Sequence, residues 1–303
     1  MPNLIRPTLI ISTLLIASSC SQPPQAEETT VSQNHQHHSQ PELPNPHSGH
    51  SPSHQGHGSP TGNYQVRLTA PKRVKPDTPV LLTLDITDAQ GEKVEQFETF
   101  QEKLMHLIVV SDDLQNFSHI HPTYKQNGRF VVEAKFPQGG NYSLFSDYKP
   151  QGQNEQVSVA KIKVNGESKS SEDISLNRSQ TIDDTQVNLN FSQPELKAKE
   201  EVKIEFDLLS SSNQKPVTDI QPYLGEKGHL VIIKSTSNLT AKDYIHAHAL
   251  KDTGEGKVHF MTAFPEAGNY KMWGQFNRGG KIVTAGFWVE VKLVGFRYRS
   301  TQP

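Results

Sequence analysis

An internal repeat constrains the fold of this chain more than any other feature of its sequence. Strand-like segments that carry histidines or a Phe-Pro turn occur twice, in the same order and with spacings that agree within a few residues. Such self-similarity indicates two copies of one structural module. The matching segments are His106–Ser111 with His229–Lys234, His119–His121 with His246–His248, and Phe136–Tyr142 with Phe264–Tyr270.

Each copy has the pattern of a series of short strands. Apolar and polar residues alternate in stretches such as 80–86, and turn residues such as those of 137–140 separate the strands. Short strands with a turn every ~8–12 residues are typical of a β-sandwich, and no long segment has helical periodicity. The chain is therefore predicted to be all-β, with one sandwich at 62–166, a polar linker at 167–180 and a second sandwich at 181–295.

The shared Phe-Pro-x-x-Gly-Asn-Tyr segment is interpreted as structural. It forms a turn that leads a tyrosine into the next strand, Tyr142 in the first copy and Tyr270 in the second. A tyrosine hydroxyl that caps a corner is a usual device of sandwich domains. We therefore expect each hydroxyl to bond to the backbone of its own turn.

Residues 1–19 have the pattern of a secretory signal peptide, with Arg6 near the start and small residues before Cys20. The apolar run at 9–16 is shorter than the ~20 residues that a membrane-spanning helix needs. The approach to the cysteine resembles the lipobox of bacterial lipoproteins, although Ala17 stands where leucine is more usual. This resemblance implies that Cys20 is lipidated and anchors an extracytoplasmic protein, on the periplasmic side or at the cell surface. The alternative is an ordinary exported protein whose cysteine is incidental.

The segment 20–61 is rich in Pro, Ser, Gln, Gly and His and has no hydrophobic periodicity. Such a composition cannot bury enough apolar surface to fold, so a disordered tether is predicted. Neutral imidazoles bind zinc, copper and nickel, and a flexible tract can wrap several around one ion. The tether is expected to capture metal weakly, or to act only as a polar spacer. It carries half of the 14 histidines of the chain: His35, His37, His38, His47, His50, His54 and His57.

Six other histidines occupy matching places in the two modules. In a strand, residues i and i+2 face the same side about 6.6 Å apart, so the two rings of a His-x-His pair can converge on one ion. A third nitrogen can come from the histidine that begins the earlier apolar strand. Three nitrogens with an open position suit Cu(II) or Zn(II) better than Ca²⁺ or Mg²⁺, which prefer oxygen. The two predicted ligand sets are His106, His119 and His121, and His229, His246 and His248.

Further ligands are available close to these sets in the sequence. Met105 precedes His106, and Met261 lies two residues after His259, the one module histidine without a counterpart. A thioether is a soft ligand for Cu(I), so both methionines and His259 are candidates for additional coordination. The competing interpretation is that all these histidines are ordinary strand-end residues, which the two copies share for packing or hydrogen bonding.

Three segments of the first module resemble a group of exported bacterial proteins, namely 105–114, 117–122 and 136–145. They are similar to the YtkA-like and FixH-like immunoglobulin-type domains. The resemblance implies two tandem immunoglobulin-like sandwiches and a role in extracytoplasmic copper handling or oxidase assembly. The second module departs from the pattern, because no proline follows its His-x-His pair and the preceding loop is longer.

Composition excludes several classes of function. A formal net charge of −2 gives no electrostatic footprint for nucleic acid. One cysteine cannot form an internal disulfide, an iron–sulfur cluster or a cysteine-based zinc site. The sequence has no nucleophile motif, no carboxylates at a recognisable catalytic spacing and no glycine-rich phosphate loop, so no enzyme is expected.

The expected function is that of a lipid-anchored extracytoplasmic metal-binding protein. Copper is the first expectation for the ion and zinc the alternative. The protein would act as a buffer or as a metallochaperone that passes ions to an acceptor protein or a pump. The alternative is a non-catalytic interaction or assembly module of the cell envelope, in which the histidines are incidental.

Overall fold

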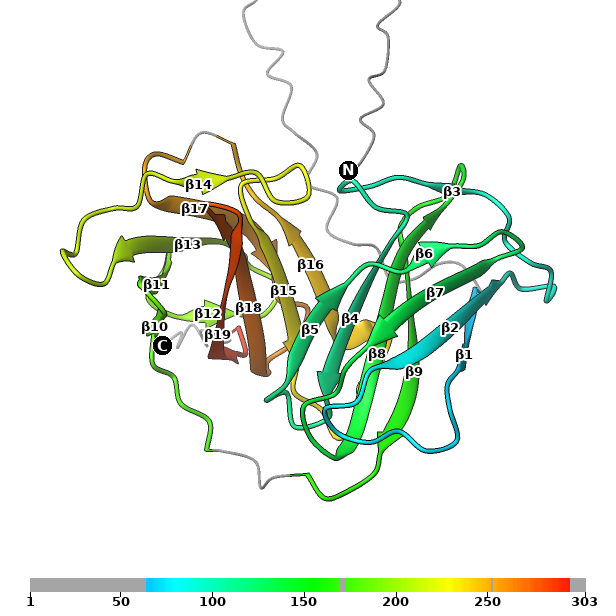
Figure 1. Ribbon diagram of the computed structural model, residues 1–303. Helices are drawn as coiled ribbons and strands as arrows, with labels where there is room; N and C mark the ends of the chain where they lie inside the picture. The colour runs from blue at the N-terminus through cyan, green and yellow to red at the C-terminus, as the bar shows by residue number, and fades with distance from the viewer. Residues whose placement is uncertain (1–63, 169–172, 252, 295–303) are drawn as a thin grey trace, which may run out of the picture. The chain divides into compact units, whose positions relative to one another are not determined.

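The computed structural model describes residues 64–168, 173–251 and 253–294 (Figure 1). The predicted signal peptide, Cys20 and the seven tether histidines lie outside the described residues. Over the described ranges no helix is long and apolar enough to cross a membrane. The only helical turn assigned there is the short 3₁₀ helix η1 (Ala241–Asp243).

The first module consists of two facing sheets. Its strands are β1 (Gln65–Thr69), β2 (Val80–Thr87), β3 (Phe97–Glu98), β4 (Met105–Ser111), β5 (Phe117–Ile120), β6 (Thr123–Tyr124), β7 (Arg129–Ala134), β8 (Gly140–Pro150) and β9 (Gln156–Val164). One sheet has the order β1-β2-β7-β6, and the other has the order β3-β8-β4-β5 with β9 paired to β8. Apolar side chains from both sheets, such as Leu84 and Leu144, form the core between them.

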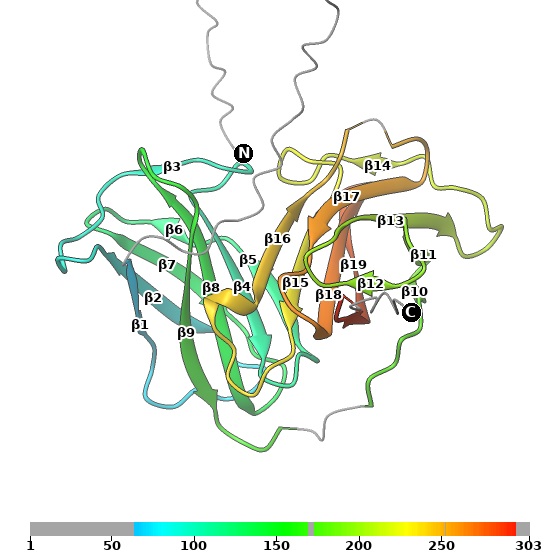
Figure 2. The same cartoon turned by 180° about the vertical axis from the view of Figure 1, so that it is seen from behind.

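The second module repeats this arrangement. Its strands are β10 (Ser179–Ile182), β11 (Thr185–Phe191), β12 (Leu196–Lys197), β13 (Glu201–Ser210), β14 (Ile220–Gln221), β15 (His229–Lys234), β16 (Tyr244–His248), β17 (Lys257–Ala263), β18 (Gly268–Arg278) and β19 (Lys281–Lys292). One sheet is β10-β11-β13-β17, and the other is β12-β19-β18-β15-β16 with β14 paired to β18. The core between them includes Phe206 and Phe287, and Figures 1 and 2 show the paired sheets of each module from both sides.

The strand pairings confirm the predicted all-β class and the two tandem immunoglobulin-like modules. β4 lies between β5 and β8, and β15 lies between β16 and β18, so equivalent strands of the two copies have equivalent neighbours. The tyrosine corners are confirmed as well. The Tyr142 hydroxyl donates to the Gln138 carbonyl at 3.0 Å, and the Tyr270 hydroxyl donates to the Glu266 carbonyl at 2.8 Å.

A third apolar cluster contains side chains from both modules. Phe117 stacks on Trp273 with ring centroids 4.7 Å apart, and Phe145 stacks on Tyr244 at 5.4 Å. Ile108 and Val231 are fully buried in the same cluster. The central strands β4 and β15 are therefore buried on both faces, which explains why each reads as a continuous apolar run instead of an alternating one.

Candidate metal centre

Strand alternation places the candidate histidines on the faces where the modules meet. In β4, Leu107 and Val109 belong to the core of the first module, whereas Ile108 and Val110 belong to the shared apolar cluster. Because side chains alternate with a period of two, His106 lies on the same face as Ile108 and Val110. The same alternation in β15 places His229 with Val231 and Ile233.

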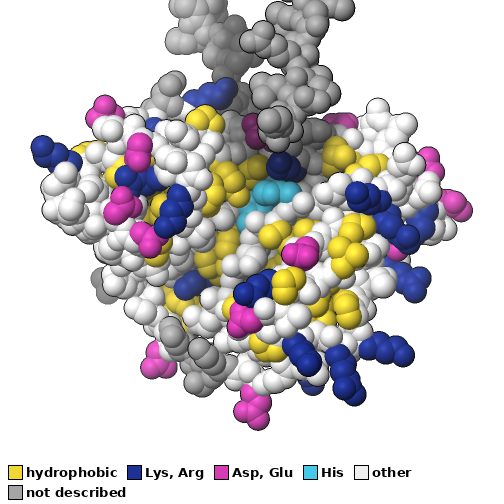
Figure 3. Space-filling view, viewed as in Figure 1, with side chains coloured by type: hydrophobic (Ala, Val, Ile, Leu, Met, Phe, Trp, Pro, Cys, Tyr) yellow, Lys and Arg dark blue, Asp and Glu magenta, His cyan; other side chains and the backbone are white. Residues whose placement is uncertain are grey.

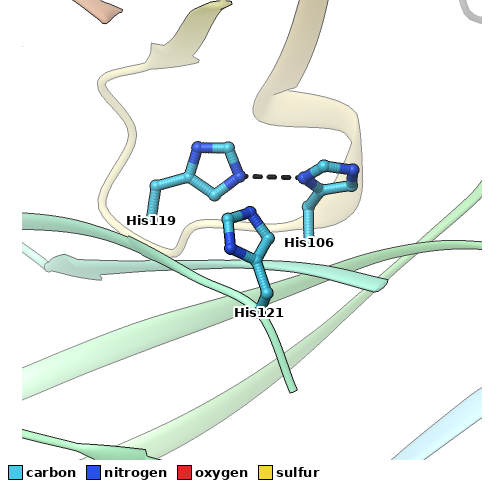
Figure 4. A group of neighbouring side chains, drawn as sticks. All are labelled: His106, His119 and His121. Atoms are coloured by element: carbon cyan, nitrogen blue, oxygen red, sulfur yellow. Dashed lines mark hydrogen bonds between the residues drawn. The ribbon is translucent and has the colours of Figure 1, made fainter. Parts of the chain in front are cut away.

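Three histidines of the first module come together at this face. The candidate ligand nitrogens of His106, His119 and His121 all lie within 4.8 Å of one another. His106 is on β4, His119 is on β5, and His121 follows directly after β5; Figure 4 shows the three rings converging. His106 is fully buried and the other two are half-buried. The structure thus brings together all three ligands predicted for the first module.

Hydrogen bonds on the outer side of two rings determine which nitrogen carries the proton. His106 Nε2 donates to the Phe100 carbonyl at 3.2 Å. His119 Nδ1 donates to Gln275 Oε1 at 2.7 Å, and the amide nitrogen of Gln275 is directed to Thr284 Oγ1. In neutral rings the other nitrogens, His106 Nδ1 and His119 Nε2, then both carry lone pairs, and they face each other at 3.0 Å. Two lone pairs at this distance repel each other unless a proton or a cation lies between them.

Burial disfavours the proton. Desolvation, reinforced by the neighbouring imidazoles, lowers the pKa of His106 far below the ordinary histidine value. Burial likewise lowers the pKa of His119 and brings the pKa of His121 to about 3. His121 Nε2 is also buried without a hydrogen-bond partner in the described part of the chain. The cluster therefore offers neutral imidazole nitrogens, which is the form that binds metal ions.

The second module carries a matching histidine pair. His229 Nε2 donates to the Tyr223 carbonyl at 2.9 Å, and His229 Nδ1 lies 3.4 Å from His246 Nε2. His246 Nδ1 donates to the Asp147 carboxylate at 3.0 Å. Both rings are buried. His248, the third predicted ligand, is on β16 opposite His229 in the strand register, and its side chain is outside the described part.

The remaining candidates lie elsewhere. Met105 is fully buried in the core of the first module, because it precedes His106 on β4 and so points to the opposite face. His259, on β17, contacts the carboxylate of Glu205 on the neighbouring strand β13. Met261, two residues further along β17, shares the face of His259. The structure does not bring these three side chains to the histidine cluster.

Two polar residues of the site were missed by the sequence analysis. Asp147 and Gln275 are buried at equivalent positions of β8 and β18, where the register pairs them with His106 and His229 respectively. No strand pattern identifies their role, because the neighbouring residues Phe145 and Trp273 are recognised as interface residues only from the contact between the modules.

Three comparisons relate the chain to known proteins. The search among curated proteins found no match. Among solved structures, the chain is similar to the Escherichia coli adhesin FdeC, with 15% identity, a TM-score of 0.26, and coverage of 76% of this chain and 65% of the adhesin. It is also similar to Salmonella alpha-2-macroglobulin, with 16% identity, a TM-score of 0.26, and coverage of 78% of this chain and 15% of that protein.

The chain spans less than two thirds of the length of each of these structures, and TM-scores this low support no inference about function. The family comparison covers much more of the chain. One family model, described as a domain of unknown function, matches residues 59–166 and again residues 180–293, once for each module. The chain therefore belongs to the family DUF8832, of which it contains two copies.

Proposed function

We propose that this protein binds a transition-metal ion through His106, His119 and His121, and that copper is the ion, with zinc as the alternative. The observation that carries the proposal is the 3.0 Å approach of His106 Nδ1 and His119 Nε2, on rings whose outer nitrogens both contact acceptor oxygens. The candidate nitrogens of all three rings lie within 4.8 Å of one another, so the cluster has the ligand number of a three-nitrogen site.

The ligand type favours copper, with zinc as the alternative. Neutral imidazoles suit copper and zinc, whereas calcium and magnesium need oxygen ligands. Two nitrogens 3.0 Å apart could both reach one ion with bonds of ~2.05 Å. Of the two metals, Cu(II) binds a given set of nitrogen ligands more tightly than Zn(II).

The exposure of the cluster suits a protein that exchanges its ion. His119 and His121 are half-buried, and the histidine side chains visible in Figure 3 gather in one place beside hydrophobic side chains. Hydrogen bonds from the non-coordinating nitrogens hold His106 and His119 in position, as outer partners do in known metal sites. An acceptor protein could approach the half-buried ligands directly. We therefore assign a buffering or metallochaperone role and no catalytic one.

The cellular setting completes the proposal. The lipobox-like segment ending at Cys20 supports an acyl anchor in the membrane on the extracytoplasmic side. The seven histidines between positions 35 and 57 would gather ions loosely near the modules. The resemblance of the first module to YtkA-like and FixH-like domains points to copper delivery to an acceptor protein or a pump.

The test is a titration of the full-length chain in which the seven histidines between positions 35 and 57 are replaced by glutamine, here named the glutamine background. Cu(II) and, separately, Zn(II) are added under calorimetry. Sub-micromolar binding, stronger than about −8 kcal/mol, is expected in the glutamine background. The double variant His119→Gln/His121→Gln should lose binding at this site. The matched control His259→Gln should bind the ion as tightly as the glutamine background. No saturable binding by the glutamine background would overturn the proposal and favour the envelope interaction module.

A further inference from the structure

The two modules exchange the hydrogen bonds that orient their candidate ligands. In the first module the residue paired with His106 is Asp147, and this carboxylate accepts from His246 of the second module at 3.0 Å. In the second module the residue paired with His229 is Gln275, and this amide accepts from His119 of the first module at 2.7 Å. One histidine of each His-x-His pair, His119 or His246, is therefore positioned by the other module.

The histidine pairs of the two modules also lie against each other. The ring centroid of His106 is 6.2 Å from that of His229 and 5.8 Å from that of His246. The centroids of His119 and His229 are 5.9 Å apart. Four imidazoles, two from each module, thus form one group at the meeting of β4, β5, β15 and β16.

His229 and His246 of the second module repeat the chemistry of His106 and His119. The outer nitrogens of His229 and His246 donate to the Tyr223 carbonyl and the Asp147 carboxylate, both of which only accept. In neutral rings the inner nitrogens, His229 Nδ1 and His246 Nε2, carry lone pairs 3.4 Å apart. Both nitrogens could reach one ion with bonds of ~2.05 Å.

We propose that His229 and His246 hold a second metal ion, so that the two modules together form a two-ion centre. This inference rests on the proposed function, because it extends metal binding from the first module to the interface. Asp147 makes the two sites unequal. It is fully buried, accepts from Tyr244 at 3.1 Å as well as from His246, and places a negative charge beside the second pair. The first pair has the neutral amide of Gln275 in the equivalent role.

A carboxylate on the outer nitrogen raises the basicity of a histidine ligand, and loss of such a partner costs roughly 10–100-fold in metal affinity. Asp147 also offsets the repulsion between two cations in neighbouring sites. Asp147→Asn is therefore expected to keep both sites and to weaken the second by about tenfold or more. Gln275→Leu should weaken the first site instead, because it removes the partner of His119.

The experiment measures stoichiometry in the glutamine background by equilibrium dialysis with Cu(II) and metal analysis. Two ions per chain are expected in the parent and in the control His259→Gln. One ion is expected in His106→Gln and one in His229→Gln, because each substitution removes a ligand from one site only. Electron paramagnetic resonance should show a half-field transition from two coupled Cu(II) ions in the parent, and neither single variant should show it.

The outcomes separate this inference from the proposed function. The two-ion centre would be overturned if His229→Gln still bound two ions, or if the parent bound one ion that was lost in both His106→Gln and His229→Gln. Either result would leave metal binding by the first module standing. No ion bound by the parent would overturn both. Thermal melts monitored by circular dichroism check that each variant is folded. If His229→Gln fails to fold, Asp147→Asn decides, since unchanged affinity at both sites in that variant contradicts the inference.

Discussion

Acidification should destabilise the metal-free protein before its carboxylates begin to titrate. Burial brings the pKa of His121 to about 3, whereas a histidine in the unfolded chain titrates near 6.5. Between these values the unfolded state binds more protons than the folded state, so stability falls as pH falls. The stabilisation from the buried neutral ring is fully present above about pH 6.5 and is lost progressively towards pH 3.

The magnitude follows from the linkage relation. At pH 5, protonation of one histidine in the unfolded state favours unfolding by about 2 kcal/mol when the folded state stays neutral. This figure depends little on the folded pKa of His121, provided that this pKa stays below about 4. His106 and His119 act in the same direction, because burial lowers their pKa values as well.

Urea denaturation of the metal-free glutamine background at pH 7 and pH 5 measures the effect. We expect a loss of at least about 2 kcal/mol in the free energy of unfolding, and His121→Gln should reduce the loss by about that amount. Ion pairs contribute little to the stability change between pH 7 and pH 5, because their carboxylates titrate in the unfolded chain at about 4.5 or below. The pKa of Asp85 is lowered by Arg129, so its contribution is present above its unfolded value near 3.8 and is lost only below it. Equal stability at pH 7 and pH 5 would falsify the claim that these imidazoles are buried in their neutral form.

Three further predictions concern other parts of the chain. Trp273→Ala removes a buried ring stacked on Phe117 and should cost about 3–5 kcal/mol in urea denaturation; a loss below 1 kcal/mol would argue against the apolar cluster shared by the modules. Tyr142→Phe removes the bond from the corner hydroxyl to the Gln138 carbonyl and should cost about 1 kcal/mol, and Tyr270→Phe should cost a similar amount. Cys20→Ser should move the protein from the membrane fraction to the soluble fraction, as seen by immunoblot of fractionated cells; a variant that stays with the membrane would contradict acyl anchoring.

The fold was predictable because each module repeats simple patterns. Alternation between 80 and 86, the turns and the internal duplication together specify two sandwiches. The three histidines of the first module were predictable for the same reason, since i and i+2 must share a face and the turn between β4 and β5 is short. These inferences need only local sequence and the geometry of a strand.

The partnership between the modules was not predictable in this way. The runs Leu107–Val110 and Leu230–Ile233 indicate strands buried on both faces, but no periodicity states what covers the second face. Asp147 and Gln275 act on histidines more than 90 positions away in the sequence. Their roles depend on a contact between two domains, and strand patterns carry no information about such a contact.

The apolar cluster and the histidines depend on each other through the face that they share. Ile108 and Val110 lie on the same side of β4 as His106, so the surfaces that bring the modules together also remove water from the rings. Desolvation is the largest cause of the lowered pKa values, and it keeps the nitrogens neutral and available for a cation. A buried lone pair that faces another lone pair is unfavourable without a proton or an ion between them. The packing that excludes the proton therefore increases the gain from binding a metal, and loss of the shared cluster should weaken metal binding even with every histidine in place.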